Sequence, residues 1–128
     1  MTVPKVIHKV IIVDGGDMPE MPEGMKKALE TWYNTNPGYE VKLYSGKDCE
    51  AYIQEHFDVE VLKAYRTLKP YAYKCDFMRH LLLYREGGWY TDMRMVCLEP
   101  LEALRRVGKD FYVCIDKPQQ QFCMYNGF

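Results

Sequence analysis

The chain has 128 residues and a formal net charge of −1, with 48% hydrophobic and 14% aromatic residues. This length corresponds to one domain with enough apolar side chains for a core, and the lack of a basic excess argues against nucleic acid as a partner. The five cysteines form no CxxC pair and no zinc-ligand spacing, which is typical of reduced thiols in an intracellular, cytoplasmic protein.

The N-terminal half alternates between strand and helix patterns. The β-branched run at 5–13 predicts a buried strand that ends in a turn at Asp14-Gly15-Gly16. Lysines interrupt this run, so it predicts neither a signal peptide nor a membrane span. We then expect, in chain order, a helix over 22–36, a half-buried strand over 39–44 and two short helices over 46–57 and 59–68.

The C-terminal half contains the strongest helix pattern, over residues 69–88. Pro70 suits the first turn of this helix and Gly87 suits its end. Steps of three and four residues predict its buried face: Tyr73, Phe77, His80, Leu81 and Tyr84. Further elements are expected as strands over 89–98, 110–115 and 121–128 and as a helix over 100–108. The alternation predicts an α/β fold with a mainly parallel sheet flanked by helices.

The chain stops within an apolar run that resembles a strand, whereas natural termini are usually polar. We therefore expect a single domain over 1–128 that is truncated at its C-terminal side.

Two pairs of opposite charges attract attention. Asp76 and Arg79 share a face of the predicted helix, and Asp92 and Arg94 share a face of the predicted strand that follows. Ligands of open α/β sheets gather at the carboxyl ends of the strands. Carboxylates bind divalent cations and guanidinium groups bind phosphate oxygens, so together these residues suit a diphosphate and its metal.

Each of these features also has a structural interpretation. A helical Asp-Arg pair three residues apart is commonly a solvated surface pair, and Asp92 with Arg94 could be an ion pair at a strand end. His8 and His80 are each expected to be hydrogen-bonded core residues. The residues alone leave these alternatives open.

Three motifs occur in order along the first hundred residues: VPKVIH at 3–8, Trp32 with NPGYEVKLY at 36–44, and CDFMRHLLLYREGGWYTDMR at 75–94. In this order the chain resembles the family 32 type of glycosyltransferases with a DXD-type sugar-binding region, related to yeast mannosyltransferases and the glucosylating clostridial toxins. The resemblance implies a GT-A fold, a Rossmann-like α/β domain that binds a nucleoside-diphosphate sugar.

The resemblance also implies roles for individual residues. It places four residues of the first strand at the nucleotide, the last three of them lining the base: His8, Lys9, Val10 and Ile11. By the same resemblance Asp76 and Arg79 would contact the ribose or the donor sugar, and Tyr90 would lie against the nucleotide. Asp92 would be the first acid of the DXD motif, near the metal (Mn²⁺ or Mg²⁺) or the sugar hydroxyls.

Arg94 stands where the family has its second acid, a direct metal ligand. Three outcomes are open: Asp92 holds the metal with another acid, Arg94 replaces the metal against the diphosphate, or catalysis is lost. Asp92 and Arg94 are thus the candidate catalytic residues.

We expect a glycosyltransferase that moves a sugar from a UDP-sugar, with UDP-glucose favoured, to a glycan or glycoprotein. The alternatives are a weakly catalytic module that binds nucleotide sugar or carbohydrate, and a plain α/β scaffold. A monomer is expected. The narrower expectation is a virus-encoded capsid glycosyltransferase of a large algal virus, acting in the host cytoplasm.

Overall fold

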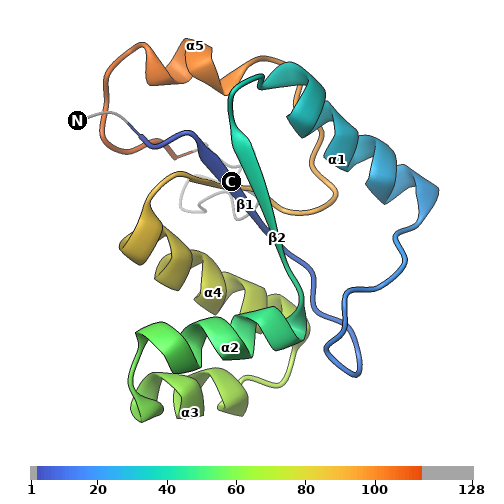
Figure 1. Ribbon diagram of the computed structural model, residues 1–128, viewed down its shortest axis with the longest axis vertical. Coiled ribbons are helices and arrows are strands. Elements are labelled where there is room, and N and C mark those ends of the chain that lie inside the picture. The colour runs from blue at the N-terminus through green and yellow to red at the C-terminus, as the bar shows by residue number, and fades with distance from the viewer. Residues whose placement is uncertain (1–2, 114–128) are drawn as a thin grey trace, which may run out of the picture.

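The computed structural model describes residues 3–113, which form a three-stranded parallel sheet with helices on both faces (Figure 1). The strands are β1 (Val6–Val10), β2 (Glu40–Tyr44) and β3 (Trp89–Tyr90), in the spatial order β2-β1-β3. In the register His8 lies opposite both Lys42 and Tyr90. The central strand β1 is therefore hydrogen-bonded on both sides, which explains the buried, β-branched pattern of its sequence.

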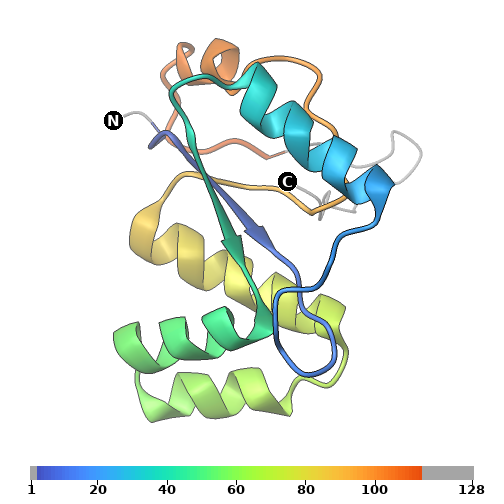
Figure 2. The same ribbon diagram turned by 45° about the vertical axis from the view of Figure 1, so that its right-hand side comes forward.

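Five helices cover the sheet: α1 (Glu23–Thr35), α2 (Gly46–His56), α3 (Val59–Thr67), α4 (Tyr71–Glu86) and α5 (Leu101–Arg105). Figure 2 shows α1 and α5 on one side of the strands and α2, α3 and α4 on the other. Within residues 3–113, none of these helices has the length and apolar character needed to cross a membrane.

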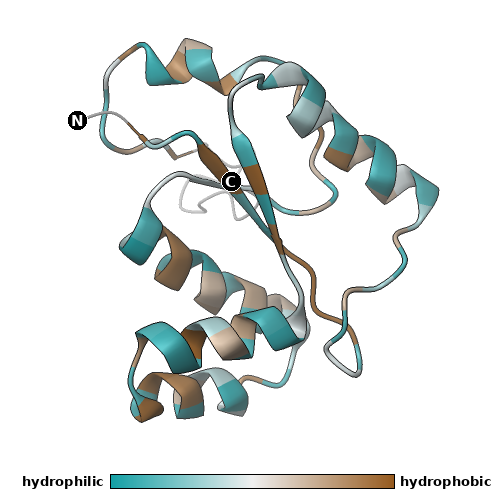
Figure 3. Cartoon of the chain, in the orientation of Figure 1, coloured by the Kyte–Doolittle hydropathy of each residue, from teal (hydrophilic) through white to brown (hydrophobic). Residues whose placement is uncertain are grey.

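Alternation along β1 divides the core into two clusters. Val10 packs with α2, α3 and α4, whereas Ile7 packs with Trp32 of α1 and with Trp89. In Figure 3 the hydrophobic colour marks the start of β1 and the loop that follows the strand. Successive side chains of a strand point to opposite faces, so β1 supplies both layers of the core.

Local sequence sets the boundaries of several elements. Ser45 and Asp48 form a capping box at the start of α2, and the Asp58 carboxylate accepts two backbone N–H bonds at the start of α3. Gly87, with a φ of 67°, ends α4. Gly88 follows with a φ of 91°, and a Cβ there would lie 2.4 Å from Val6 Cγ1. Glycine at this position thus allows β3 to pair closely with β1.

The observed parallel sheet flanked by helices agrees with the predicted α/β class, and most predicted elements are confirmed. Three are clearly shorter: the strand expected over 5–13 ends at Val10, the strand expected over 89–98 covers only Trp89–Tyr90, and the helix expected over 100–108 covers only Leu101–Arg105. Residues 110–113 form no strand. The strand expected over 121–128 lies outside the described residues.

The predicted buried face of α4 is only partly correct. Phe77 and Leu81 are partly buried and pack against the core, whereas Tyr73 is 58% and Tyr84 85% exposed, and His80 is exposed rather than a core residue. Met78 and Leu82 form the fully buried side of the helix, and the exposed tyrosines keep their hydroxyls near water. His8, by contrast, is buried and hydrogen-bonded to Tyr44 Oη at 3.0 Å and to the Gly87 carbonyl at 2.9 Å, as expected.

Candidate functional site

The segment after β3 is a turn and not a continuing strand. Thr91 donates the last bond of the ladder, to the carbonyl of His8 (3.3 Å), and Met95 N then donates to the Asp92 carbonyl (3.2 Å). Met93 is buried while Arg94 is exposed. The expectation that Asp92 and Arg94 share a strand face is therefore wrong, because the bond from Met95 N to the Asp92 carbonyl closes a turn that contains Met93 and Arg94.

Helix α1 binds the segment beyond this turn. Trp32 Nε1 donates to the Met95 carbonyl (2.7 Å), and Cys97 N donates to Thr31 Oγ1 (2.8 Å). These bonds satisfy backbone groups that have no strand partner. The turn is thus supported by α1 even though it has left the sheet.

Arg79 brings together the charged residues of the site. Its Nη2 atom lies 2.6 Å from Asp76 Oδ1 and 3.7 Å from Asp92 Oδ1, and its guanidinium carbon lies 4.9 Å from the centroid of the Tyr90 ring. The Arg79 side chain is only 11% exposed, against 49% for Asp76 and 45% for Asp92. A mostly buried arginine between two half-exposed carboxylates differs from the solvated surface pair that its spacing also allowed.

The electrostatics of Asp92 reflect this position. Burial raises the pKa of the Asp92 carboxyl, Arg79 opposes the increase, and the neighbouring Asp76 adds to it. Two buried atoms at the cluster, Arg79 Nε and the Tyr90 hydroxyl, have no hydrogen-bond partner among the described residues. The cluster therefore combines two accessible acceptors, the carboxylates of Asp76 and Asp92, with two buried polar atoms that have no partner among the described residues.

Arg94 lies apart from this cluster. It is exposed and forms no hydrogen bond or ion pair with another residue in 3–113. Of the four charged residues singled out by the sequence, Asp76, Arg79 and Asp92 come together, and Arg94 follows on the same turn with its side chain in solvent.

The residues expected around the base lie in the core. His8 and Lys9 are 0% exposed, Val10 is 4% exposed, and only Ile11 is partly accessible. Lys9 Nζ donates to Thr91 Oγ1 (2.7 Å) and to the Asp92 carbonyl (3.1 Å). Burial lowers the pKa of Lys9 to about 7, against an opposing effect of Asp92. Because these side chains are buried, a nucleotide could contact this segment only past the carboxyl end of β1.

Such a place exists at the carboxyl ends of β1 and β2, as a cavity of about 400 Å³. It is lined by the loop after β1, the start of α2, α3 and the start of α4: Ile12, Val13, Gly15, Gly16, Gly46, Lys47, Glu50, Tyr65, Tyr71 and Lys74. Lys74 Nζ lies 4.2 Å from the Tyr65 ring and donates to the Tyr65 carbonyl (3.0 Å), and the Tyr71 hydroxyl donates to Asp14. Sequence reasoning missed Lys47 and Lys74, although the Asp14-Gly15-Gly16 turn marked the loop between them.

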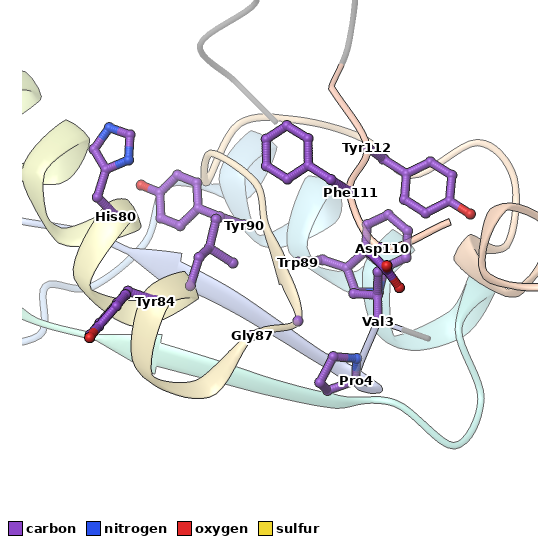
Figure 4. Close-up of a pocket in the computed structure, with 12 residues that line it drawn as sticks. Val3, Pro4, His80, Tyr84, Gly87, Trp89, Tyr90, Asp110, Phe111 and Tyr112 are labelled. Carbon is purple, nitrogen blue, oxygen red and sulfur yellow. The ribbon is translucent and has the colours of Figure 1, made fainter. Parts of the chain in front are cut away.

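A second and larger cavity, of about 670 Å³, lies elsewhere, along the edge of β3 (Figure 4). Its lining is mainly apolar and aromatic, including Tyr84, Trp89, Phe111 and Tyr112. None of Asp76, Arg79 and Asp92 lines it, whereas Tyr90 both lines it and lies against Arg79. Among residues 3–113, its lining contains no lysine or arginine to bind a diphosphate.

A divalent metal was expected on Asp92, and such an ion needs several oxygen ligands. Within residues 3–113 no three His, Cys, Asp or Glu side chains lie close enough to hold a metal. Both acids of the cluster already face the Arg79 guanidinium, at 2.6 Å and 3.7 Å. The described side chains therefore do not fit a metal by themselves, and the cation that faces both acids is Arg79.

Comparison with known proteins shows to which family the chain belongs. Residues 22–110 match the family described as glycosyltransferase sugar-binding region containing DXD motif. The chain is 34% identical to the initiation-specific alpha-1,6-mannosyltransferase of Candida albicans over 69% of this chain and 23% of that protein. It is 28% identical to an uncharacterized glycosyltransferase of Acanthamoeba polyphaga mimivirus, over 96% of this chain and 47% of that protein.

A third relative, inositol phosphoceramide mannosyltransferase 2 of Schizosaccharomyces pombe, is 28% identical over 80% of this chain and 28% of that protein. The chain thus spans less than half the length of these relatives. No solved structure matches it. The family match covers more than half of the chain and includes Asp76, Arg79 and Asp92, so the protein belongs to the glycosyltransferases whose sugar-binding region contains the DXD motif.

Proposed function

We propose that this chain binds a nucleoside-diphosphate sugar at the cluster of Asp76, Arg79 and Asp92 and takes part in transfer of its sugar to an acceptor. The observation that carries the proposal is the mostly buried Arg79 guanidinium between two half-exposed carboxylates, next to the carboxyl end of β3. Family membership supports glycosyl transfer as the reaction.

Each residue of the cluster has a distinct chemical task in this proposal. The carboxylates of Asp76 and Asp92 accept hydrogen bonds from sugar hydroxyls, and Arg79 orients both. Arg94, exposed on the same turn, reaches the diphosphate and neutralises the charge that develops as the nucleoside diphosphate leaves. Of the three outcomes that the sequence left open, this role of Arg94 is the one in which the arginine replaces the metal against the diphosphate.

The cavity of about 400 Å³ at the ends of β1 and β2 is the place we assign to the nucleoside. The cavity follows the carboxyl end of β1 and the cluster follows the carboxyl end of β3, the strand next to β1, so both lie along the same edge of the sheet. A donor that spans the carboxyl edge of a parallel sheet in this way agrees with a Rossmann-like, GT-A type of fold.

Two donor sugars compete in the proposal. UDP-glucose is the donor expected from the sequence, whereas two of the relatives described above are named as mannosyltransferases. Mannose is therefore the competing sugar. The proposal extends to a glycan or glycoprotein acceptor and a monomeric chain. The mimivirus relative supports a viral origin, and a capsid glycosyltransferase in the host cytoplasm remains a proposal.

The first experiment measures thermal stabilisation by UDP-glucose, GDP-mannose and UDP, each with Mn²⁺ and with EDTA. A ligand at 100 times its dissociation constant adds about 2.7 kcal/mol to the free energy of unfolding. We expect a shift with one of the sugar donors in EDTA. A shift that needs Mn²⁺ would instead require metal ligands from outside the described residues.

Asp92→Asn tests the place of the site, with Glu99→Gln as the control on an exposed residue further along the same connection. Asn keeps the size of the side chain but removes the charge, so the shift should be lost in Asp92→Asn and retained in Glu99→Gln. Stabilisation that survives in Asp92→Asn would show that the donor binds elsewhere. Hydrolysis of the sugar donor distinguishes a transferase from a module that only binds nucleotide sugar, because the module would show the thermal shift without turnover.

A further inference from the structure

Lys9 occupies an unusual position, at the centre of the sheet. It lies on β1 and is 0% exposed, on the face that α1 covers. Its Nζ atom lies 4.3 Å from the centroid of the Trp32 ring, where the ring face attracts a cation. Removal of an amine from water is unfavourable unless the amine finds hydrogen-bond acceptors. The partners of Nζ therefore explain why a lysine is tolerated there.

Both acceptors of Nζ belong to the segment that carries Asp92. They are Thr91 Oγ1 at 2.7 Å and the Asp92 carbonyl at 3.1 Å, and Thr91 is itself 0% exposed. The same Asp92 carbonyl accepts the bond from Met95 N that closes the turn. A lysine amine keeps two N–H donors even when neutral, so both bonds form in either protonation state.

The geometry separates the backbone of Asp92 from its side chain. The carbonyl is bound from the α1 side of the sheet by Lys9, whereas the carboxylate lies 3.7 Å from Arg79, on α4. Lys9 is buried and cannot touch a ligand. Any influence of Lys9 on the donor must therefore pass through the position of Asp92.

We propose that Lys9 is a positioning residue, whose two hydrogen bonds fix the turn of Thr91 to Met95 and thereby set the Asp92 carboxylate beside Arg79. The effect on the donor rests on the proposed function, whereas the effect on the turn does not. A methionine would fill nearly the same volume without the two donors, which makes Lys9→Met the informative change.

The first measurement is hydrogen–deuterium exchange of the backbone amides in residues 91–97, compared between the natural chain and Lys9→Met. Loss of a buried hydrogen bond corresponds to about a tenfold faster exchange of these amides. Lys42→Met is the matched control, because Lys42 lies on the adjacent strand and binds Glu86 at 2.9 Å instead of the turn. Exchange in β1 and α4 shows whether a change is confined to the turn.

Thr91→Val provides a second test if Lys9→Met does not fold. It removes one acceptor of Nζ in a side chain of nearly equal shape and leaves Lys9 in place. Faster exchange in the turn, absent from Lys42→Met, supports the proposal. Unchanged exchange of residues 91–97 in both Lys9→Met and Thr91→Val overturns it.

Donor binding provides the second readout. We expect the dissociation constant of the donor to rise about tenfold in Lys9→Met, the equivalent of one lost hydrogen bond, and to stay unchanged in Lys42→Met. Lys9→Gln keeps a side-chain N–H group, so it should bind the sugar donor more tightly than Lys9→Met does. The two variants should have equal thermal stability. Faster exchange with unchanged donor affinity would overturn the positioning role. A natural chain that binds no donor would overturn the proposed function, and the exchange measurement would still decide the role of Lys9 in the turn.

Discussion

One guanidinium, that of Arg79, connects the residues of the candidate site. It contacts Asp76, faces Asp92 and covers the ring of Tyr90. Burial and the neighbouring Asp76 both raise the pKa of Asp92, and Arg79 opposes them. Arg79 therefore favours the charged form of Asp92 in addition to orienting the two carboxylates.

This role predicts a change in titration. In Arg79→Gln the pKa of Asp92 should rise further, because burial and Asp76 both raise it and the opposing cation is gone. NMR titration of the Asp92 side-chain carboxyl carbon measures this value. Arg66→Gln is the control, since it removes an arginine that pairs with Glu50 instead. An Asp92 pKa equal to that of the natural chain would contradict the role of Arg79.

At the scale of elements, the approach of β3 to β1 depends on Gly88. An added Cβ would lie 2.4 Å from Val6 Cγ1 and 2.6 Å from the Val6 carbonyl oxygen, inside the sheet. The atoms it meets are held by strand pairing and cannot move without separating the strands. A side chain at this position would displace β3 and the Asp92 turn that follows it.

Gly88→Ala should therefore lower the free energy of unfolding by about 3 kcal/mol, of which the positive φ accounts for about 1 to 2 kcal/mol. Gly38→Ala isolates the backbone contribution, because Gly38 has a φ of 84° and nothing within 4 Å of an added Cβ. Urea unfolding of both variants measures the difference. Equal losses would show that the contact with Val6 costs nothing.

The sequence predicted the helices better than the end of β3. Capping residues such as Ser45 and Asp58 and the stop at Gly87 act locally, and the elements they bound are found as expected. The turn after Thr91 depends on burial of Met93 and on the indole of Trp32, which lies about sixty residues earlier in the chain. Neither influence is visible in the local alternation of apolar and polar residues.

For the candidate site, too, the sequence predicted the features that are local and missed those that depend on residues distant in the chain. Helical spacing joined Asp76 to Arg79, and the motif order brought Asp92 to them. The burial of Lys9 was not predictable, because its acceptors belong to a segment distant in sequence. The cavity lined by Lys47 and Lys74 was missed because three separate helices and a loop form it.

At the scale of the whole molecule, the site draws on both layers that cover the sheet. The Asp92 backbone is bound from the side of α1 and its side chain faces α4. His8, in the same central strand, also joins distant segments, since its ring contacts Tyr44 and the Gly87 carbonyl. The stability of the sheet and the geometry of the site are thus coupled through β1.

His8 makes stability depend on pH. Burial lowers its pKa in the folded state, whereas the unfolded chain takes up a proton near pH 6.5. Below about pH 6.5 the unfolded state therefore binds more protons, and the free energy of unfolding falls by up to about 1.4 kcal/mol per pH unit. Urea unfolding between about pH 5.5 and 6.5 measures this slope, above the range in which carboxylates titrate.

The slope should flatten in His8→Phe and persist in His80→Gln, which changes an exposed histidine. The slope is informative even if His8→Phe is less stable, because it reports proton uptake and not the absolute free energy. A slope in His8→Phe as steep as in the natural chain would assign the proton uptake to another group.

The bonds between α1 and the segment after the Asp92 turn also bear on the order of assembly. Four hydrogen bonds join residues that are 61 to 66 positions apart in the sequence. They link Trp32 to Met95, Thr31 to Cys97, and Asn36 to both Cys97 and Leu101. Such closures are slow compared with helix formation, because a long loop must be ordered before any contact is gained. We therefore expect α2, α3 and α4 to form early and the Asp92 turn to form late, so that donor-binding competence appears only when the whole domain has folded.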